Sequence, residues 1–174
     1  RCSAARILFV QSDVAPRVIE MLKGTMSELR IGNPMSYTTD VGPVIDAEAQ
    51  QKLNAHKKRM GAVAKTIMDL PLPAACANGT FVSPAAYELK DLKPLTEEVF
   101  GPVLHVVQYE GQHLNKVIEA INATGFGLTL GLHTRIETTV DMVRKQARVG
   151  NLYVNRNQIG AVVGVQPFGG EGMS

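Results

Sequence analysis

A cysteine at the second position carries the strongest chemical signal in this 174-residue chain. Cys2 lies in the segment Arg1–Arg6, directly before the apolar run Ile7–Val10, which is typical of a buried strand. A thiol ionises more readily when it is partly exposed near positive charge, and the thiolate is the reactive form. We therefore predict that Cys2 is an exposed nucleophile at the edge of a strand. Cys76 stands between two alanines, and we interpret it as structural, as most unpaired cysteines are.

A second candidate group lies in the segment Pro94–Pro102, where two carboxylates precede an aromatic residue. An isolated pair such as Glu97–Glu98 is more often a solvated surface feature than a binding site. Here Phe100 follows, and Gly101–Pro102 provides a stiff turn into the next apolar run. A carboxylate can accept two hydroxyl hydrogen bonds, and an aromatic ring can pack beside a flat ligand ring. The segment is therefore a candidate binding wall.

The third candidate is the glycine-rich segment that begins at Ile159. Amides flanked by glycines, such as those around Gly160, can form a small anion-binding nest without a charged side chain. Composition alone favours an ordinary loop. The glycines form no Gly-x-Gly-x-x-Gly motif between a strand and a helix, so the chain does not bind a whole dinucleotide by itself. The 4 histidines show no metal-binding spacing, and we expect no zinc site.

Three segments together, Arg1–Arg6, Pro94–Pro102 and Gln166–Gly170, resemble the aldehyde dehydrogenase superfamily in their order and separation. In that superfamily the nucleophilic cysteine lies in a sequence like Gly-Gln-Arg-Cys-Ser-Ala. The resemblance implies that the Cys2 thiolate attacks an aldehyde, that hydride passes to NAD+, and that water hydrolyses the remaining thioester to the acid. It also implies an oxyanion hole made by the backbone N–H of Cys2 and an asparagine that this chain lacks.

The same resemblance implies that only part of an NAD site is present. Glu98 would bind the hydroxyls of the nicotinamide ribose, and Phe100 would pack beside the nicotinamide. The Rossmann-type cofactor domain and the general-base glutamate lie upstream of the cysteine in this superfamily, so we expect both to be absent. The lack of an initiator Met and the abrupt stop at Gly172–Ser174 indicate an excised fragment. We predict that it folds but does not turn over alone.

The segment Asn155–Gly170 resembles a narrower group, the L-glutamate γ-semialdehyde (pyrroline-5-carboxylate) dehydrogenases, and especially that domain in the bifunctional proline utilization A family. This resemblance implies that the backbone N–H groups of Gly160 and Ala161 bind the substrate α-carboxylate. It further implies that the hydroxyl of Ser3 assists and that the ring of Phe168 packs on the aliphatic chain. We expect Asn155 and Arg156 to brace the loop.

A parent protein of the proline utilization A family would carry further partners. The resemblance implies a separate proline dehydrogenase domain with FAD, a homo-oligomer, peripheral association with the membrane and, in some lineages, DNA binding by another part of the protein. We expect no nucleic acid contact from this domain. Its partners would be a small-molecule substrate and the missing cofactor domain of the same chain.

Two other functions remain open. A dehydrogenase for another semialdehyde, such as succinic semialdehyde, would need an Arg or Lys aimed at a distal carboxylate, and residues 160–168 contain none. A non-catalytic domain kept for assembly or substrate channelling would have no need of Cys2, Glu98, Phe100 and Phe168 together. We therefore favour oxidation of glutamate semialdehyde to glutamate in proline catabolism.

Bulk properties are those of a globular domain. The formal net charge is +2 and the charges are nearly balanced, which gives no sign of disorder or of a nucleic-acid footprint. No apolar run approaches the roughly 20 residues that span a bilayer. With 2 cysteines there is no disulfide framework, so we expect a reducing, cytoplasmic location.

The elements that would position these groups alternate between strands and helices. This alternation predicts one α/β layered domain over residues 1–174, with a mostly parallel sheet flanked by helices. Strands are expected at 7–10, 66–70, 80–83, 85–89, 103–109, 128–133 and 152–154. Helices are expected from Ser12 or Asp13 to the stop at Gly32–Pro34, at 46–65, from 114 to about Gly125, and at 134–150, the last opened by a capping box of Thr134 and Glu137.

Overall fold

The computed structural model describes residues 2–166 and 168–174. The chain divides into two compact units. We call Arg6–Glu110 the four-stranded unit, and Arg1–Ala5 together with Gly111–Ser174 the cysteine unit. The expectation of one domain over residues 1–174 stays a prediction.

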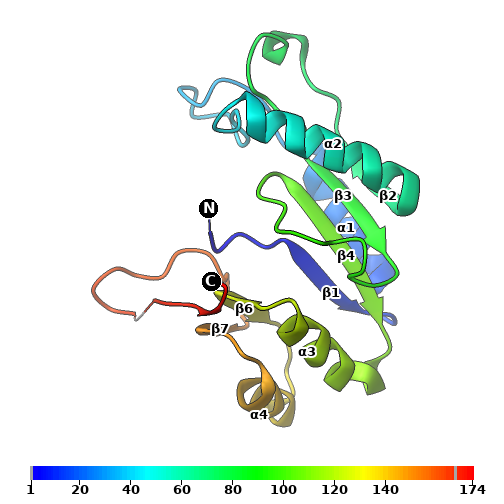
Figure 1. The fold of residues 1–174 in the computed structure, drawn as a ribbon, viewed down its shortest axis with the longest axis vertical. Coiled ribbons are helices and arrows are strands. Elements are labelled where there is room, and N and C mark those ends of the chain that lie inside the picture. The colour runs from blue at the N-terminus through cyan, green and yellow to red at the C-terminus, as the bar shows by residue number, and fades with distance from the viewer. Residues whose placement is uncertain (1, 167) are drawn as a thin grey trace. The chain divides into compact units, whose positions relative to one another are not determined.

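The four-stranded unit is built on one sheet with the strand order β1-β4-β3-β2 (Figure 1). Its strands are β1 (Ile7–Gln11), β2 (Lys65–Asp69), β3 (Ala85–Leu89) and β4 (Val103–Tyr109). β4 pairs in parallel with both β1 and β3, and β2 joins the edge antiparallel to β3. β1 begins directly after Arg6. It lies next to β4, which follows the Pro94–Pro102 segment.

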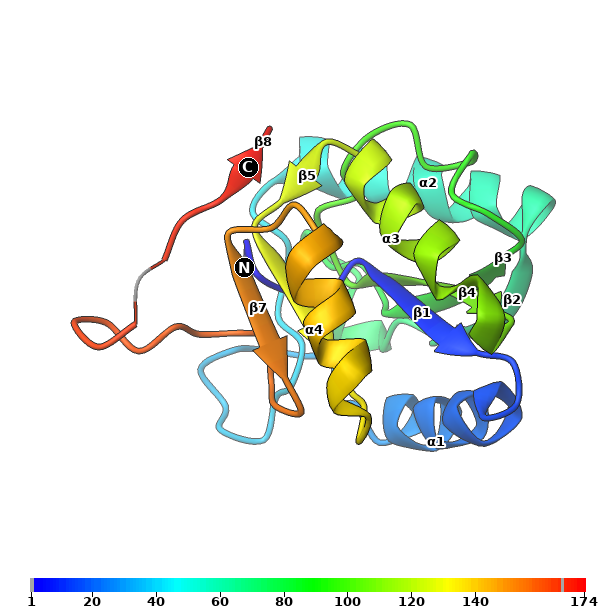
Figure 2. The same cartoon turned by 90° about the horizontal axis from the view of Figure 1, so that it is seen from below.

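Helices cover both faces of this sheet, α1 (Ala15–Ser27) on one side and α2 (Ala47–Val63) on the other (Figure 2). Side chains along a strand alternate between the two faces. Ala86 and Val106 accordingly pack with Met26 of α1, whereas Tyr87 packs in a second cluster with Leu53 of α2. The prediction of an α/β fold with a mostly parallel sheet flanked by helices is confirmed.

The cysteine unit contains two small sheets and two helices. In chain order they are α3 (Leu114–Ala123), β5 (Phe126–Gly127), β6 (Thr129–Leu132), α4 (Glu137–Gln146), β7 (Asn151–Val154) and β8 (Glu171–Gly172). β6 and β7 pair in parallel, and β5 pairs with β8 antiparallel. A short 3₁₀ turn lies at Gly111–His113 in this unit, and another lies at Ala74–Cys76 in the four-stranded unit. Figure 2 labels β7 and β8 and shows the segment between them, in orange and red, as a wide loop.

In the four-stranded unit, both the start and the end of α1 differ from the prediction. α1 begins after Val14 with no side-chain cap, so Ser12 and Asp13 are not its cap, although Pro16 lies in the first turn as expected. The helix ends at Ser27, well before Gly32, because Asp40 binds both the N–H and the carbonyl of Arg30 and so draws that backbone out of the helix. α2 begins at its predicted cap, where the Asp46 carboxylate accepts the N–H of Ala49 at 2.8 Å.

The predicted capping box of the last helix is wrong. α4 starts at Glu137 behind Ile136, with no side-chain cap. The backbone of Thr134 is instead bound by the side chain of Asn155, whose Oδ1 accepts its N–H at 2.9 Å and whose Nδ2 donates to its carbonyl at 2.8 Å. The helix ends at Gln146, where Asn122 binds the carbonyl. Within the described residues, no helix has the length and apolar character needed to cross a membrane.

Two expectations about strands are also corrected. Residues 80–83 form no strand, because their backbone groups bind a loop and a helix instead of a neighbouring strand. Thr80 exchanges hydrogen bonds with Val44, and the Gln50 side chain donates to the carbonyls of Gly79 and Phe81. The glycine-rich tail, predicted as loop throughout, contains β8. The other predicted strands are present within one or two residues of their expected bounds.

Candidate active site

The turn that carries Cys2 is fixed through its backbone. Cys2 is a free, exposed cysteine, and Ser3 beside it is buried, with 5% of its surface exposed. The Ser3 carbonyl accepts the hydroxyl of Thr129 at 3.4 Å and the Nε2 amide of Gln158 at 3.5 Å. The thiol therefore projects from a turn whose next residue is anchored, which suits a nucleophile. The predicted neighbour Arg1 lies outside the described residues.

Gln158 is a site residue that the sequence reasoning missed. It lies two residues before Gly160 and reaches across β6 to the carbonyl of Ser3. A Cβ atom at Gly131, in the middle of β6, would stand 2.6 Å from the Gln158 Oε1 atom. A glycine within a strand marks the close approach of another group, so Gly131 was the available signal.

The predicted carboxylate-binding loop has the backbone form that anion nests need. Gly160 has a φ of 77°, a left-handed conformation, and a Cβ atom there would meet open space. The Asn157 side chain accepts the N–H of Ile159 at 2.8 Å and so closes the turn before it. Among the described residues, no hydrogen bond to the protein uses the N–H of Gly160 or of Ala161. Both amides are free to bind a ligand.

The far end of this loop is pinned where it rejoins the unit. Asn151, the first residue of β7, donates to the carbonyls of Gly169 at 2.7 Å and Leu128 at 3.0 Å. Gly150 leaves no room for a side chain, because a Cβ atom there would collide with the Gly169 carbonyl. Phe168, one residue earlier, keeps 49% of its surface exposed. The ring predicted to contact the substrate thus stands beside a fixed backbone point.

Glu98 and Phe100 share one cationic partner in the four-stranded unit. The Arg6 Nε atom lies 3.5 Å from Glu98 Oε1, and the Arg6 guanidinium carbon lies 4.3 Å from the centre of the Phe100 ring. The Glu98 side chain is 43% exposed and the Phe100 ring 55% exposed, so both keep a free face. Arg6 was also missed, although it follows Cys2 by only four positions. An exposed carboxylate beside an exposed ring fits the ribose and nicotinamide of NAD.

The predicted residues therefore fall into two groups. Cys2, Ser3, Gly160, Ala161 and Phe168 belong to the cysteine unit, where the Ser3–Gln158 bond links the turn that carries Cys2 to the loop that contains Gly160. Glu98 and Phe100 belong to the four-stranded unit, where Arg6 holds them. The Asn155 side chain binds the backbone of Thr134, and the Arg156 guanidinium lies 5.2 Å from the centre of the Tyr153 ring. Neither of these contacts is with the glycine-rich loop, and the bracing of that loop by Asn155 and Arg156 stays a prediction. Cys76 is buried, as expected for a structural cysteine.

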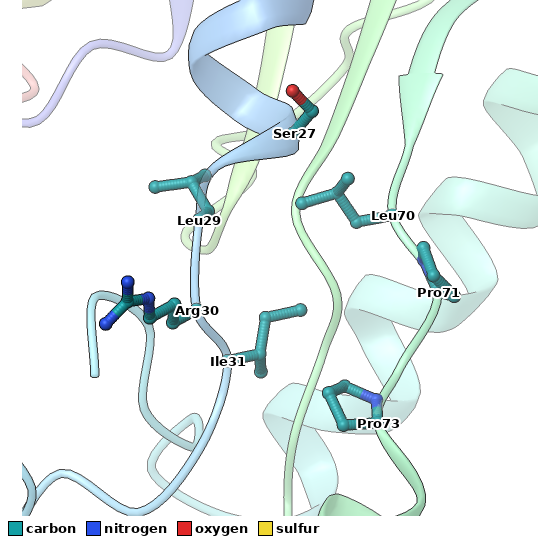
Figure 3. A pocket seen from close by; sticks show the side chains of 7 residues that line it. All are labelled: Ser27, Leu29, Arg30, Ile31, Leu70, Pro71 and Pro73. Atoms are coloured by element: carbon teal, nitrogen blue, oxygen red, sulfur yellow. The ribbon is translucent and has the colours of Figure 1, made fainter. Parts of the chain in front are cut away.

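A pocket elsewhere in the four-stranded unit is separate from these groups. It encloses about 300 Å³ and is lined by the end of α1 and the segment after β2 (Figure 3): Ser27, Leu29, Arg30, Ile31, Leu70, Pro71 and Pro73. No predicted site residue lines it. Across residues 2–166 and 168–174, no cluster of three or more His, Cys, Asp or Glu side chains is placed to hold a metal ion.

The curated proteins to which this chain is similar are several times its length. It is 53% identical over 179 residues to the bifunctional protein PutA of Klebsiella aerogenes, and the match covers 100% of this chain and 14% of that protein. It is 32% identical over 178 residues to the 1-pyrroline-5-carboxylate dehydrogenase of a Geobacillus species, with 100% of this chain and 33% of that protein covered. The chain thus spans a third or less of the length of these relatives.

Solved structures give the same result for the fold. A variant of proline utilization A (PutA) from Bradyrhizobium japonicum is 55% identical with a TM-score of 0.94, over 99% of this chain and 17% of that one. A 1-pyrroline-5-carboxylate dehydrogenase from Thermus, crystallised with bound NAD, is 31% identical with a TM-score of 0.87, over 99% of this chain and 33% of that one. The aldehyde dehydrogenase family matches residues 1–174, and the chain therefore belongs to the aldehyde dehydrogenase family.

Proposed function

We propose that this chain supplies the nucleophile, the substrate loop and one wall of the NAD site of an L-glutamate γ-semialdehyde dehydrogenase that acts in proline catabolism. One observation carries the proposal: the exposed Cys2 thiol stands on a turn whose buried neighbour, Ser3, is hydrogen-bonded to the loop that contains Gly160. Relatives named for PutA and for 1-pyrroline-5-carboxylate dehydrogenase support the choice of substrate.

The chemistry at Cys2 is covalent catalysis. Its thiolate forms a C–S bond to the aldehyde carbon while the carbonyl electron pair moves onto oxygen, and the backbone N–H of Cys2 donates to that oxygen. Glu98 and Phe100 would hold NAD+, which would supply the hydride acceptor needed for the thiohemiacetal on Cys2 to become a thioester. Water then attacks the thioester carbon and gives a proton to a base outside this chain. The C–S bond breaks, the acid leaves and Cys2 returns as thiolate.

The substrate is held by backbone rather than by charged side chains. The free N–H groups of Gly160 and Ala161 bind the α-carboxylate as a nest, and the Ser3 hydroxyl assists. The exposed ring of Phe168 packs on the aliphatic chain of the semialdehyde. On the cofactor side, Glu98 binds the ribose hydroxyls and Phe100 packs beside the nicotinamide, both held by Arg6.

The rest of the parent protein completes the enzyme. A cofactor domain on the same chain supplies the remainder of the NAD site, the second oxyanion donor and the general base. We propose that the parent is a cytoplasmic homo-oligomer, associated peripherally with the membrane if it is a proline utilization A protein, and that FAD belongs to its separate proline dehydrogenase domain. This chain alone contacts no nucleic acid and does not turn over.

NADH production from L-glutamate γ-semialdehyde tests the proposal on the full-length parent and on the 174-residue chain side by side. We expect an active parent and a silent chain. Activity of the parent with succinic semialdehyde alone would assign a different substrate. A parent that is silent with every aldehyde, and whose Cys2 resists alkylation, would point to a domain kept for assembly. Turnover by the chain alone would overturn the claim that the cofactor domain is required.

A further inference from the structure

Two buried histidines in the four-stranded unit meet face to edge and take no part in the proposed chemistry. His56 lies on α2 and His105 on β4, and they are 7% and 1% exposed. Their Nε2 atoms are 2.9 Å apart, and their rings are 87° from coplanar with centres at 5.1 Å. A contact this short between ring nitrogens is a hydrogen bond, and one ring must donate while the other accepts.

The two ends of the pair decide which ring donates. The Nδ1 atom of His56 lies 3.1 Å from the Arg59 guanidinium, which can only donate, so this Nδ1 accepts and His56 carries its proton on Nε2. At the other end, the Nδ1 atom of His105 lies 3.1 Å from the carbonyl of Arg6, which can only accept. His105 therefore carries its proton on Nδ1, and its Nε2 accepts from His56. All three hydrogen bonds are made when both rings are neutral.

A proton added to either ring breaks this chain of bonds. On His105 it would place two N–H groups against each other, and on His56 it would place an N–H against the Arg59 guanidinium. Burial, followed by the nearby charges of His105 and Arg59, lowers the pKa of His56 to about 4, and burial is the main cause that lowers the pKa of His105. Tyr87 on β3 lies beside His105 in the sheet, and its hydroxyl donates to Asp69.

Both ends of the chain of bonds reach the segment that carries Glu98 and Phe100. At one end, Arg6 contacts both side chains and its carbonyl is held by the ring and the backbone N–H of His105. At the other end, the Arg59 guanidinium donates to the carbonyl of Pro94 at 2.6 Å, where the segment begins.

The segment also lies directly on the helix that carries His56. A Cβ atom at Gly101 would stand 2.5 Å from both terminal methyl groups of Leu53, which is three residues before His56 on α2. The segment is thus held at its start by Arg59, in its middle by Arg6 and near its end by Leu53. Two of these three holds depend on the histidine pair.

We propose that His56 and His105 are positioning residues, which as a neutral hydrogen-bonded pair hold Arg6 and the Pro94–Pro102 segment so that Glu98 and Phe100 face the nicotinamide end of NAD. The meaning for NAD rests on the proposed function. The hold on the segment does not, and it can be measured without cofactor. Neither histidine touches substrate or cofactor, so their effect is transmitted through Arg6 and Arg59.

The test uses the full-length parent and its cleavage by a glutamate-specific protease. Glu97 and Glu98 are exposed and lie in the middle of the held segment, whereas Glu119 on α3 reports on the cysteine unit. His105→Phe removes both ring hydrogen bonds, and His105→Asn restores a donor near the position of Nδ1. Arg59→Met removes the hydrogen bond to the Pro94 carbonyl. Because Arg59 is exposed, this second variant keeps the test possible if His105→Phe does not fold. His113→Asn, in the other unit, is the matched control.

We expect His105→Phe and Arg59→Met each to speed cleavage at Glu97 or Glu98 on the order of tenfold without a matching rise at Glu119, since local opening follows the loss of local bonds. His105→Asn should recover most of the protection, and His113→Asn should behave as the parent. The KM for NAD+ should rise in parallel while the KM for the aldehyde stays within about twofold. Unchanged cleavage, or equal rises at Glu119, would overturn the positioning role. If protection depends on the pair but the parent does not bind NAD+, the proposed function fails and the hold on the segment stands.

Discussion

The two halves of the predicted site are held by different kinds of interaction. In the cysteine unit, uncharged amide side chains bind backbone groups: Gln158 holds the turn of Cys2, Asn155 holds the end of β7, and Asn151 holds the return of the substrate loop. These bonds join segments far apart in the chain, and none of them involves a titratable group.

In the four-stranded unit, cations and histidines do the same work. Arg6 contacts both Glu98 and Phe100. The histidine pair, bound at its other end by Arg59, holds Arg6 in place. Salt screens ion pairs, and acid protonates imidazoles, whereas neither acts on an amide. The difference predicts that the contacts that hold the substrate side are insensitive to pH and salt, and that those that hold the cofactor side respond to both.

The largest expected effect is the loss of turnover when the nucleophile is removed. Cys2→Ala in the full-length parent should lower kcat on the order of 10⁴-fold, because no other group can form the covalent intermediate. NAD+ affinity, measured by calorimetry, should stay within about twofold of the parent. Cys76→Ala is the control and should retain turnover. Residual activity of Cys2→Ala above a few per cent would remove Cys2 from the mechanism.

A second variant attacks the substrate side through its backbone. Gly150→Ala places a Cβ atom against the Gly169 carbonyl and 3.0 Å from the Gly170 Cα, so the loop must move. We expect the KM for the aldehyde to rise about 10- to 100-fold, since displaced contacts of this kind cost about 1–3 kcal/mol. The KM for NAD+ should not change.

Gly169→Ala is the matched control for that variant, because a Cβ atom at Gly169 meets open space. It should leave the KM for the aldehyde within about twofold. Equal effects of the two substitutions would show that the loop position is not set by the Gly150–Gly169 contact.

Sequence reasoning succeeded where local chemistry decides the structure and failed where distant segments meet. The exposure of Cys2, the burial of Cys76 and the cap at Asp46 follow from residues within a few positions. Gln158 was missed because its bond to Ser3 joins residues 155 positions apart, and Gly131 signals only that some group approaches that strand closely. The predicted capping box was wrong for the same reason, because the Asn155 side chain, 21 positions away, binds the backbone of Thr134.

The histidine pair shows the same limit from the opposite direction. Metal-ligand spacing in the sequence does not reveal the histidine pair, because the two rings meet from different elements: 49 positions separate His56 from His105, and 99 separate His105 from Arg6. The residue types were visible in the sequence, but their pairing was not. The roles proposed for Gly160 and Phe100 come from family resemblance, and the left-handed φ of Gly160 and the exposed ring of Phe100 support them.

Acid should destabilise the four-stranded unit through His56. Its pKa is about 4 in the folded chain and about 6.5 when unfolded, so the unfolded state binds the proton first as pH falls. Stability is full above pH 6.5 and is lost between about pH 6.5 and pH 4. We expect urea unfolding of the chain to show a loss of about 1–2 kcal/mol between pH 7 and pH 5. His56→Gln should reduce that loss, and the exposed-site control His133→Gln should not. An unchanged loss in His56→Gln would assign the acid response to another group.

Arg6→Met tests the cationic hold on the cofactor wall. The ion pair with Glu98 is partly exposed and the contact with Phe100 is a cation–π interaction, which together contribute about 1 kcal/mol. The Kd for NAD+ should therefore rise about fivefold, with the KM for the aldehyde unchanged. Arg17→Met, on α1, is the control. Raising the salt concentration should weaken NAD+ binding in the parent more than in Arg6→Met, and equal salt responses would exclude Arg6 as the hold.

Gln158→Ala is the smallest change and the sharpest contrast with Arg6. The bond it removes is long, at 3.5 Å, and the Thr129 hydroxyl still binds the Ser3 carbonyl, so a loss of about 0.5–1 kcal/mol is expected. The KM for the aldehyde should rise about threefold and the Kd for NAD+ should stay constant, with the exposed Gln112→Ala as control. Because an amide carries no charge, the ratio of variant to parent should be the same at low and high salt and from pH 6 to pH 8. A ratio that varies with salt would mean that charge, and not backbone geometry, sets the substrate side, and the distinction between the two halves would then fail.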